Sequence, residues 1–413
     1  MSVTVERVRA LVGEGGYFVD DQMALRHGAQ RDGFRYVGLP LTPGFTSIRQ
    51  PSSAVLVIIT LSNGSVALGD CVAVQYTGVA GRDANMSPND IVDYVRETVA
   101  PSWEGREINH FSLASSWLDE MEWRGGPLPS VVGYGLSQAL LHAVALSQQR
   151  TMAEVVVEEF ATGVSLQPVP LFTQSGDERY HSVDRMILKR ADILPHGLMN
   201  SEEVVGRDGV KFVEYVAWVT QRVAALSPDE DYVPRLHFDT YGMLGVACGQ
   251  RMDDVVSLLG RVRAAASTLQ IRIEHPVDGG SRDHHIELMA DLKVRLARSG
   301  IDVGIVADEW CNTLEDMRHF VAANAADMIH VKVPDVGPLH QSIAAMSLLR
   351  DSGVGAYFGG SCTETDVSAR VSAHVAMACG ADQALAKPGM GVDEGLAIMR
   401  NEMRRTTALA TTK

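Results

Sequence analysis

The sequence is poor in cysteine and contains no C-x-x-C pair. Its five cysteines are Cys71, Cys248, Cys311, Cys362 and Cys379. An odd number at such wide spacings argues against a disulfide framework and against a structural zinc site, and it fits a reducing compartment. Residues 1–16 also lack the apolar core of a signal peptide. We therefore expect a soluble, cytoplasmic protein.

Long apolar runs and basic residues are also scarce. The longest strongly apolar run, residues 54–61, is too short to span a bilayer. The chain has 36 Lys and Arg against 51 Asp and Glu, a net charge of −15. Nucleic acids and anionic membranes need a basic footprint, so neither is an expected partner. Walker A, G-x-S-x-G and strand-following G-x-G-x-x-G patterns are missing, which leaves nucleotide binding and serine hydrolysis without support.

The chain does contain ample core material, because 46% of its 413 residues are hydrophobic. Residues 1–160 read as an α+β unit that includes a strand, a tight Asn63-Gly64 turn and a return strand. Two helices and two long loops complete this unit, and such loops are often lids or binding loops. The expected strands span residues 54–61 and 66–68, the helices 88–100 and 131–159, and the loops 28–43 and 78–85.

From about residue 161 short apolar strands alternate with amphipathic helices. The expected strands span residues 167–173, 186–194, 235–239, 271–274, 303–308, 328–332, 355–359 and 384–387. Asp283 is a candidate cap for a helix that ends at Gly300, and Thr313 with Asp316 resembles a capping box. Eight strand–helix units over residues 161–413 predict an α/β fold of the (β/α)8 barrel type. Periodicity leaves a doubly wound open sheet as the alternative.

Three predicted barrel strands end in carboxylates, at Asp239, Glu274 and Asp308. Their spacing is close to one strand–helix unit, so the side chains should converge where barrel active sites lie, at the C-terminal ends of the strands. Three close carboxylates repel unless a hard cation neutralises them, and an all-oxygen site suits Mg²⁺. The alternative is that each is an ordinary strand-end or capping acid.

The sixth predicted barrel strand carries His330 and Lys332, which point to the same side because they are two residues apart. A lysine within an apolar strand either titrates low or has a partner, and a lowered pKa makes a lysine a general base. A lysine that reaches solvent is the simpler reading. His196 ends the second strand, nearly opposite in a ring of eight, and is a candidate acid or base on the other face of a substrate. Taken alone, it reads better as a satisfied core or rim histidine.

Two glycine-rich turns follow the last predicted strands: Gly359-Gly-Ser-Cys362 and Gly389-Met-Gly391. Such turns let backbone N–H groups approach a carboxylate or phosphate, although simple turn chemistry explains them equally well. His284 and His285 resemble a metal pair, but at the start of a helix both are expected to be solvated.

Several long motifs resemble the methylaspartate ammonia-lyase family of the enolase superfamily. They are Gly16-Tyr-Phe-Val-Asp-Asp-Gln22, Asp32-Gly-Phe34, Gly69-Asp-Cys-Val-Ala-Val-Gln-Tyr76, Gln174-Ser-Gly-Asp177, Leu194-Pro-His196, Val306-Ala-Asp-Glu-Trp-Cys-Asn312 and Leu385-Ala-Lys-Pro-Gly-Met-Gly-Val-Asp-Glu-Gly395. The resemblance runs nearly end to end. It implies an enolase-like fold, with an N-terminal α+β capping domain on a modified (β/α)8 TIM barrel, and a homodimer.

The resemblance also implies a reaction: reversible, Mg²⁺-dependent elimination of ammonia from (2S,3S)-3-methylaspartate to give mesaconate, through removal of the C3 proton and an enolate. Asp239, Glu274 and Asp308 would hold Mg²⁺, and Lys332 would be the base. His196 would act on the opposite face. K⁺ is a further expected activator.

The remaining substrate-binding residues follow from the same resemblance. Gln75 and Gln174 would approach the amino group, whereas Ser361 and the backbone of Cys362 would hold the carboxylate remote from C3. His330 would touch the metal-bound carboxylate.

The sequence departs from the family pattern at four positions. They are His330 for Gln, Ser361 for Thr, Thr363 for Asn and His275 for Gly. The first two leave the preferred substituent at C3 open, so an ammonia-lyase for a differently 3-substituted aspartate is one alternative. The others are a racemase or dehydratase of the same superfamily, and a catalytically silent binding module.

Overall fold

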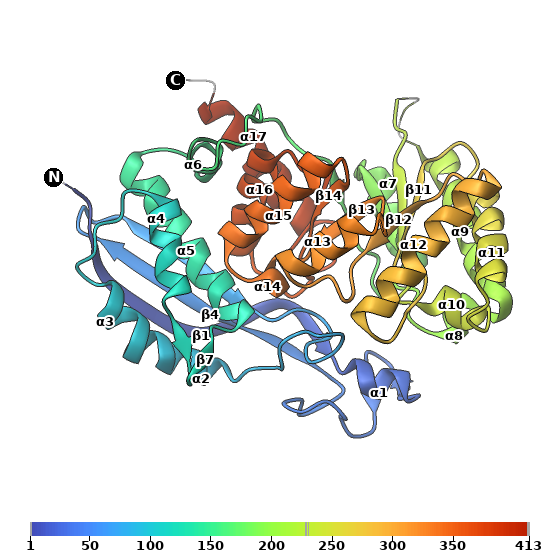
Figure 1. Cartoon of the computed structure of the whole chain (residues 1–413), viewed down its shortest axis with the longest axis horizontal. Helices are drawn as coiled ribbons and strands as arrows, with labels where there is room; N and C mark the ends of the chain where they lie inside the picture. Colours follow the sequence, from blue (N-terminus) through green and yellow to red (C-terminus); the bar gives the residue numbers. More distant parts are fainter. Residues whose placement is uncertain (1, 228, 230, 411–413) are drawn as a thin grey trace.

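The computed structural model describes residues 2–227, 229 and 231–410. Its first part contains a three-stranded antiparallel sheet of order β1-β4-β5 (Figure 1). The strands are β1 (Val5–Asp20), β4 (Arg49–Leu61) and β5 (Val66–Val72). The predicted hairpin is confirmed, since β4 and β5 pair on either side of Asn63 and Gly64. Strand β1 is not among the predicted strands, because its several glycines and many polar residues weaken the strand pattern.

Helices cover this sheet. They are α2 (Pro88–Tyr94), the π-helical turn η1 (Val95–Val99), α3 (Ala100–Trp103), α4 (Phe111–Asp119), α5 (Ser130–Gln148) and α6 (Met152–Glu159), with a small β6 (Glu122–Trp123) and β7 (Gly126–Pro127) ribbon. The helix expected at 131–159 is two helices, because Gln149 adopts a left-handed conformation and Thr151 caps a new helix with Glu154. Helix α5 lies against β4 and β5 on one side and against the barrel helices on the other.

Among the described residues α5 is the one helix long and apolar enough to cross a membrane, and most of it is buried inside the protein. Its approach to the sheet is close: a Cβ on Gly69 would lie 2.3 Å from the carbonyl oxygen of Gly135. Glycine is therefore required where β5 meets α5. The apolar length of α5 reflects a helix surrounded by protein on all sides.

The second part of the chain is a closed barrel of eight parallel strands, in the order β10-β11-β12-β13-β14-β15-β8-β9. The strands are β8 (Leu171–Phe172), β9 (Ile193–His196), β10 (Arg235–Asp239), β11 (Ile271–Glu274), β12 (Gly304–Ala307), β13 (Met328–Val331), β14 (Gly355–Phe358) and β15 (Gln383–Leu385). The predicted barrel is confirmed, and the closed ring rules out the open sheet. As expected, β9 and β13 lie opposite each other.

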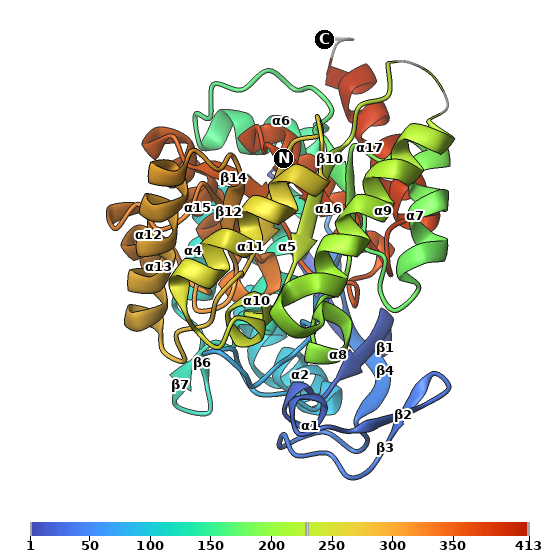
Figure 2. The same ribbon diagram turned by 90° about the vertical axis from the view of Figure 1, so that its right-hand side faces the viewer.

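Helices surround the ring (Figure 2). They are α7 (Arg179–Leu188), α8 (Glu202–Val205), η2 (Arg207–Gly209), α9 (Val210–Leu226), α10 (Met243–Ala247), α11 (Met252–Ala265), α12 (Arg282–Ser299), α13 (Leu314–Ala322), α14 (Val333–Val336), α15 (Leu339–Ser352), α16 (Asp366–Cys379) and α17 (Glu394–Ala410). The Thr313–Asp316 capping box is confirmed at the start of α13.

The predicted strand at 186–194 is wrong. Its apolar residues belong to two elements, because α7 continues to Leu188 and Arg190 turns the chain in a left-handed conformation before β9 begins. The strand expected at 167–173 is reduced to the two residues of β8. Both errors arise because short apolar runs fit a helix end as well as a buried strand.

Helix α12 follows the predicted apolar face and ends at Gly300, but Ser281 occupies the N-cap position that was expected for Asp283. The prediction that both histidines at its start are solvated is wrong for one of them. His284 is exposed, whereas His285 is completely buried. The helix turns His285 inward, on the same side as Ile286 and Met289.

The predicted loop 28–43 contains a small hairpin of β2 (Gln30–Asp32) and β3 (Arg35–Val37), which follows α1 (Gln22–Arg26). Together these elements form a lobe across one end of the barrel (Figure 2). Arg49 connects the capping elements to the barrel, because its guanidinium lies 2.7 Å from Asp20 and 3.0 Å from Asp177 of the barrel part. The capping elements therefore close the end of the barrel at which the strands terminate.

Candidate active site

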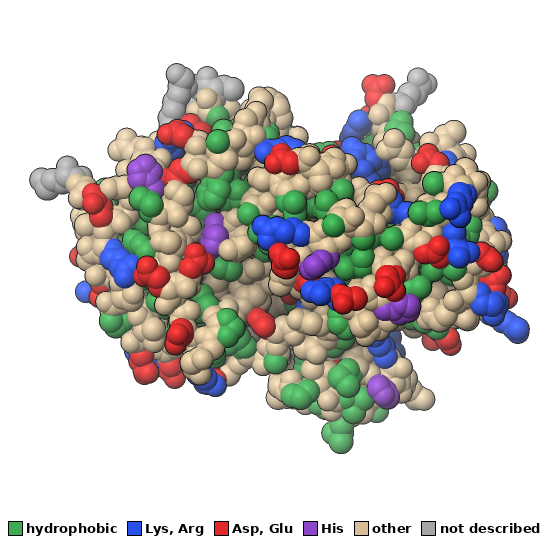
Figure 3. Space-filling view, in the orientation of Figure 1, with side chains coloured by type: hydrophobic (Ala, Val, Ile, Leu, Met, Phe, Trp, Pro, Cys, Tyr) green, Lys and Arg blue, Asp and Glu red, His purple; other side chains and the backbone are tan. Residues whose placement is uncertain are grey.

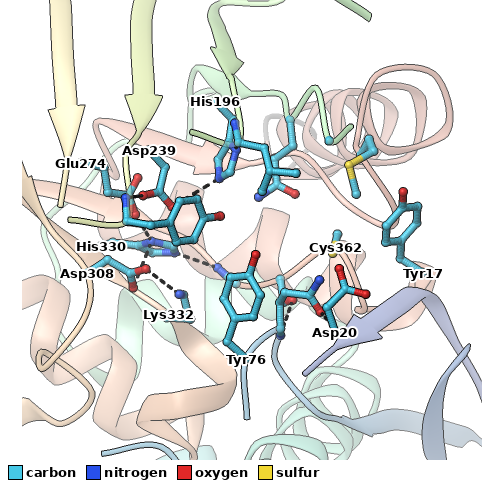
Figure 4. A pocket seen from close by; sticks show the side chains of 18 of the residues that line it. Tyr17, Asp20, Tyr76, His196, Asp239, Glu274, Asp308, His330, Lys332 and Cys362 are labelled. Carbon is cyan, nitrogen blue, oxygen red and sulfur yellow. Dashed lines mark hydrogen bonds and ion pairs between the residues drawn. The ribbon is translucent and has the colours of Figure 1, made fainter. Parts of the chain in front are cut away.

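A pocket of about 730 Å³, including the solvent at its mouth, lies between the strand ends and the capping elements (Figure 4). It is lined by all ten residues that the sequence predicts for the site: Gln75, Gln174, His196, Asp239, Glu274, Asp308, His330, Lys332, Ser361 and Cys362. They come from seven of the eight barrel strands or the turns after them and from the loop after β5. The fold therefore brings together residues that are up to 287 positions apart, from 75 to 362.

The carboxylates meet because of strand register. Asp239 pairs with Glu274 on neighbouring parallel strands, and Glu274 pairs with Val306, two residues before Asp308. All three acids are nearly inaccessible to solvent. Burial and the Asp239 charge raise the pKa of Glu274 to about 7. A cation at this point would remove the cost of ionising it.

The donor atoms fit a cation. One ligand atom each from Glu274, Asp308 and His330 lie within 4.8 Å of one another. The Oδ1 atom of Asp308 is buried and has no hydrogen-bond partner, which is costly for a carboxylate oxygen unless a cation takes it. Asp239 lies beside this group rather than within it, and its Oδ2 is 3.5 Å from Nε2 of His196.

His330 is held between the acids and the glycine turn after β14. Its Nε2 accepts a hydrogen bond from the Gly360 N–H at 3.2 Å, so the proton belongs on Nδ1, which lies 2.8 Å from Oε1 of Glu274. The ring stacks on Tyr357 at 4.1 Å between centroids. A Cβ on Gly359 would lie 1.8 Å from Nε2, so the histidine fits only because that residue is glycine.

Lys332 has an ion-pair partner in the structure, which is one of the two possibilities that the sequence left open. It is the residue before α14, and its Nζ lies 2.6 Å from Oδ2 of Asp308. Burial and Arg82 lower the pKa of Lys332, but the nearby acids, Asp308 first, outweigh them, and the net shift is upward. In this arrangement the lysine is protonated and paired with a residue of the acid cluster.

Arg82 is a site residue that sequence reasoning did not identify. It enters from the predicted binding loop 78–85 and is almost completely buried. Its Nε donates to Asp335 at 2.7 Å, and a terminal nitrogen lies 3.5 Å from Oδ1 of Asp308. Only the Gly-rich loop marked this segment in the sequence, and nothing there indicated that its arginine would point at the acids.

His196 ends β9 in a left-handed conformation, with φ of 67°. Its ring faces Asp239, on the side of the pocket opposite Lys332 (Figure 4). The two candidate bases therefore flank the space in which a substrate would lie. This placement is the one expected from the ring order of β9 and β13.

The other end of the pocket is built from backbone contacts. The Gln75 N–H donates to Ser361 Oγ at 3.0 Å, and the Gln75 side-chain oxygen accepts from the Asp20 N–H at 3.1 Å. Gln174 follows β8, and its N–H donates to Met390. Burial raises the pKa of the Cys362 thiol to about 12, so the thiol is neutral at pH 7.

Comparison with known proteins places the site in context. The family model described as "Methylaspartate ammonia-lyase N-terminus" matches residues 3–161, and the corresponding C-terminal model matches residues 163–412. The chain is 46% identical to methylaspartate ammonia-lyase 1 of Carboxydothermus hydrogenoformans, over 98% of this chain and 96% of that protein. It is 44% identical to the methylaspartate ammonia-lyase of Clostridium tetanomorphum, over 96% of each chain.

Solved structures agree. A magnesium complex of β-methylaspartase from Clostridium tetanomorphum aligns with a TM-score of 0.93 and 42% identity, over 99% of both chains. The Citrobacter amalonaticus enzyme containing (2S,3S)-3-methylaspartic acid aligns with a TM-score of 0.95 and 41% identity, over 99% of this chain and all of that one. Muconate lactonizing enzyme from Pseudomonas fluorescens shares the fold, with a TM-score of 0.61 and 16% identity, over 93% of this chain and 88% of that one.

Proposed function

Because this chain belongs to the methylaspartate ammonia-lyase family, we propose that it reversibly removes ammonia from (2S,3S)-3-methylaspartate to give mesaconate. The observation that carries the proposal is the pocket itself, since all ten residues that the family resemblance assigns to the site line it. A relative whose structure contains (2S,3S)-3-methylaspartic acid supports the choice of substrate.

Asp239, Glu274 and Asp308 would hold Mg²⁺. The buried Oδ1 of Asp308, which accepts no hydrogen bond, and the magnesium complex of a relative support this assignment. Bound Mg²⁺ would stabilise the negative charge that develops on the substrate carboxylate beside C3. The chain itself supplies a dry cavity, because all three acids are buried. Activation by K⁺ stays a prediction.

Lys332 would take the proton from C3 through Nζ in its neutral form, which a cation held by Asp308 would favour because it cancels the negative charge that keeps the lysine protonated. His196 would act on the opposite face. Their positions support separate roles, because β13 and β9 are four places apart in the ring of eight. A base must lie within hydrogen-bond reach of the proton that it removes. Lys332 and His196 would therefore each act on the face of the substrate that it borders. Arg82 would position Asp308 and Lys332, because its guanidinium lies beside both the acid cluster and Asp335.

Gln75 and Gln174 would hold the amino group, and Ser361 with the Cys362 N–H would hold the carboxylate remote from C3. The hydrogen bond from the Gln75 N–H to Ser361 Oγ supports this assignment, because it places a residue for the amino group beside a residue for the carboxylate. His330 would border the substrate carboxylate nearest the acids, where its ring is fixed by Gly360 and Tyr357. A rigid ring in place of a flexible amide changes the shape of the pocket next to C3.

The test follows the enoate absorbance and the release of ammonia after 3-methylaspartate and Mg²⁺ are added. We expect both signals with wild type and neither with Lys332→Ala. Lys189→Ala, a partly exposed lysine at the end of α7, is the matched control and should behave as wild type. Epimerised 3-methylaspartate without release of ammonia would instead favour a racemase-type reaction of the same superfamily.

The substituted residues favour a second candidate, an ammonia-lyase for a differently 3-substituted aspartate. His330 and Ser361 both line the pocket at positions where the family has Gln and Thr. A panel of aspartate, 3-methylaspartate and larger 3-alkylaspartates separates the two candidates. If 3-methylaspartate gives the highest kcat/KM, the first holds.

We further propose that the protein is a cytoplasmic homodimer, with its capping and barrel units divided near residue 160. The family models, which meet at residues 161 and 163, support the division. Apolar side chains are exposed on the lobe that α1 and the 28–43 loop form (Figure 3). One of them is Leu39, which is 84% exposed. Burial of such a patch by a second copy would stabilise a dimer.

Light scattering tests the dimer. Leu39→Glu should shift the protein toward monomer, whereas Leu188→Glu, at an exposed leucine on the outside of the barrel, should not. A wild-type monomer at micromolar concentration would contradict the proposal.

A further inference from the structure

A second group of potential metal ligands lies outside the active site, where the chain passes from β11 into α12. It consists of His275, Asp278 and His285, here called the His275 cluster. One ligand atom from each residue lies within 4.8 Å of the other two. Both histidines are completely buried, and the aspartate is partly buried. The proposed mechanism uses none of these residues.

His275 occupies its position at an energetic cost. It has φ of 48°, in the left-handed region that glycine adopts freely and other residues adopt at a cost. Its Nε2 and both ring nitrogens of His285 have no hydrogen-bond partner. Buried polar groups without partners are rare in folded proteins, and a cluster of three such nitrogens calls for a ligand. A strained backbone with unsatisfied ring nitrogens points to function.

The surroundings of His275 resemble those of a metal-binding histidine. Its Nδ1 lies 2.7 Å from Oε2 of Glu309, although the ring is not aligned for a good hydrogen bond. Metal-ligating histidines commonly present their other ring nitrogen to a carboxylate, which orients the ring and increases its basicity. Glu309 thus faces Nδ1 and leaves Nε2 for a ligand.

His285 and Asp278, the other two residues of the His275 cluster, are also held in fixed positions. The His285 ring stacks on His275 with 4.8 Å between centroids. The Asp278 carboxylate is held by the Gly280 N–H at 2.9 Å and by the Trp310 ring at 3.3 Å.

We propose that His275, Asp278 and His285 bind one Zn²⁺ ion as a structural site. Two imidazoles with one carboxylate suit Zn²⁺, whereas Mg²⁺ prefers oxygen ligands alone. A fourth ligand position would be left to water. The scarcity and spacing of cysteines cannot exclude such a site, because it uses none.

The site would brace the active centre without taking part in the reaction. His275 follows Glu274 in the chain, and Glu309 follows Asp308, so the cluster lies directly behind two proposed magnesium ligands. Asp278 also lies 3.9 Å from Arg26 of α1 in the capping lobe. A metal here would fix the β11–α12 loop against both neighbours, and its loss should reduce stability more than turnover.

The experiment measures zinc bound per chain. Protein stripped with EDTA is returned to saturating Mg²⁺, mixed with excess Zn²⁺, desalted and analysed for elements. We expect about one Zn²⁺ per wild-type chain and a higher melting temperature with Zn²⁺ than without it. His285→Gln should reduce bound zinc to a trace. His284→Gln, the exposed neighbour on the same helix, is the matched control and should keep it.

Two further variants decide where the zinc binds. His275→Gly removes a ligand and suits the left-handed backbone, and Asp278→Asn changes only the carboxylate; both should lose zinc even if His285→Gln does not fold. His330→Gln removes the histidine that lies beside Glu274 and Asp308 in the active site and should retain zinc. Wild-type protein without zinc, or zinc lost with His330→Gln but kept in His275→Gly and Asp278→Asn, would overturn the proposal. The cluster would then be a buried ion pair of His275 with Glu309.

Discussion

Lys387→Met should destabilise the protein strongly, because this lysine is the counter-ion of a completely buried acid. Its Nζ donates to Glu364 at 2.7 Å and to the Gly359 carbonyl at 2.8 Å. Both side chains have 0% exposure. The acid also accepts from the Ser361 N–H and from Tyr134, so the pair holds the turn that lines the substrate pocket.

The magnitude follows from burial. Removal of one partner from a buried ion pair leaves an uncompensated charge and costs about 3–5 kcal/mol. Methionine keeps most of the volume of lysine, so little of this cost would come from a cavity. Glu364 would retain two hydrogen-bond donors after the change, which places the expected loss at the lower end, about 3 kcal/mol. Turnover should fall as well, because the Ser361 backbone loses its support.

The assay is urea unfolding followed by tryptophan fluorescence and far-UV circular dichroism. Arg318→Met removes an exposed partner of Glu315 and is the control. It should change the free energy of unfolding little, since exposed ion pairs contribute little. A Lys387→Met protein within about 1 kcal/mol of wild type would refute the reasoning, because the pair would then behave like one at the surface.

Substitution of Glu364, the acid of the pair, should change how the stability of the protein depends on pH. Burial lowers the pKa of Lys387, and Glu364 opposes that shift. In Glu364→Gln the Glu364 charge no longer opposes the effect of burial, so the pKa of Lys387 in the folded state falls further. Between that lowered pKa and the ordinary value of 10.5, the folded state binds fewer protons than the unfolded state. Stability must rise with pH where the unfolded state binds more protons. The variant should therefore gain stability on alkalinisation more steeply than wild type, as urea unfolding between pH 7 and 10 would show.

Three other predictions concern the reaction. Chelation with EDTA should abolish activity and Mg²⁺ should restore it, and Asp308→Asn should fold normally, by circular dichroism, yet lose most turnover; activity that survives chelation would contradict the metal assignment. Lys332→Ala should abolish turnover of the (2S,3S) diastereomer, while His196→Ala should chiefly slow the (2S,3R) one; equal losses in both variants would argue against separate roles. His330→Gln should change the kcat/KM ranking among 3-substituted aspartates, and an unchanged ranking would show that the histidine is simply tolerated.

The barrel could be predicted because its signals are local and repeated. Each strand is a short apolar run followed by an amphipathic helix, and the parallel register then carries Asp239 and Glu274 to the same level. Strand spacing alone thus identified acids that the structure places together. Lys332 and His196 followed from the same logic, because ring order fixes which strands face each other.

The remaining features depend on tertiary contacts that no local pattern encodes. Arg82 reaches Asp308 from a loop of another unit, across 226 positions from 82 to 308. His285 is buried because α12 turns it against Phe320 and His275, although its neighbour His284 is exposed. Strand β1 exists because β4 pairs with it, and its glycines would not predict a strand in isolation.

The protonation states around Glu274 explain why this acid needs a cation despite its close partners. Gln383 donates to Nδ1 of His237, so His237 donates through Nε2 to one Glu274 oxygen at 2.8 Å. Burial lowers the pKa of His237 to about 3, so it is neutral. The other oxygen accepts from His330, whose Nε2 is taken by Gly360 and which therefore has a single proton to give. Both contacts orient the carboxylate and neither supplies a positive charge. The charge balance of Glu274 is thus left to a bound cation. A neutral His330, like a Gln at the same position, would leave that role to the proposed Mg²⁺.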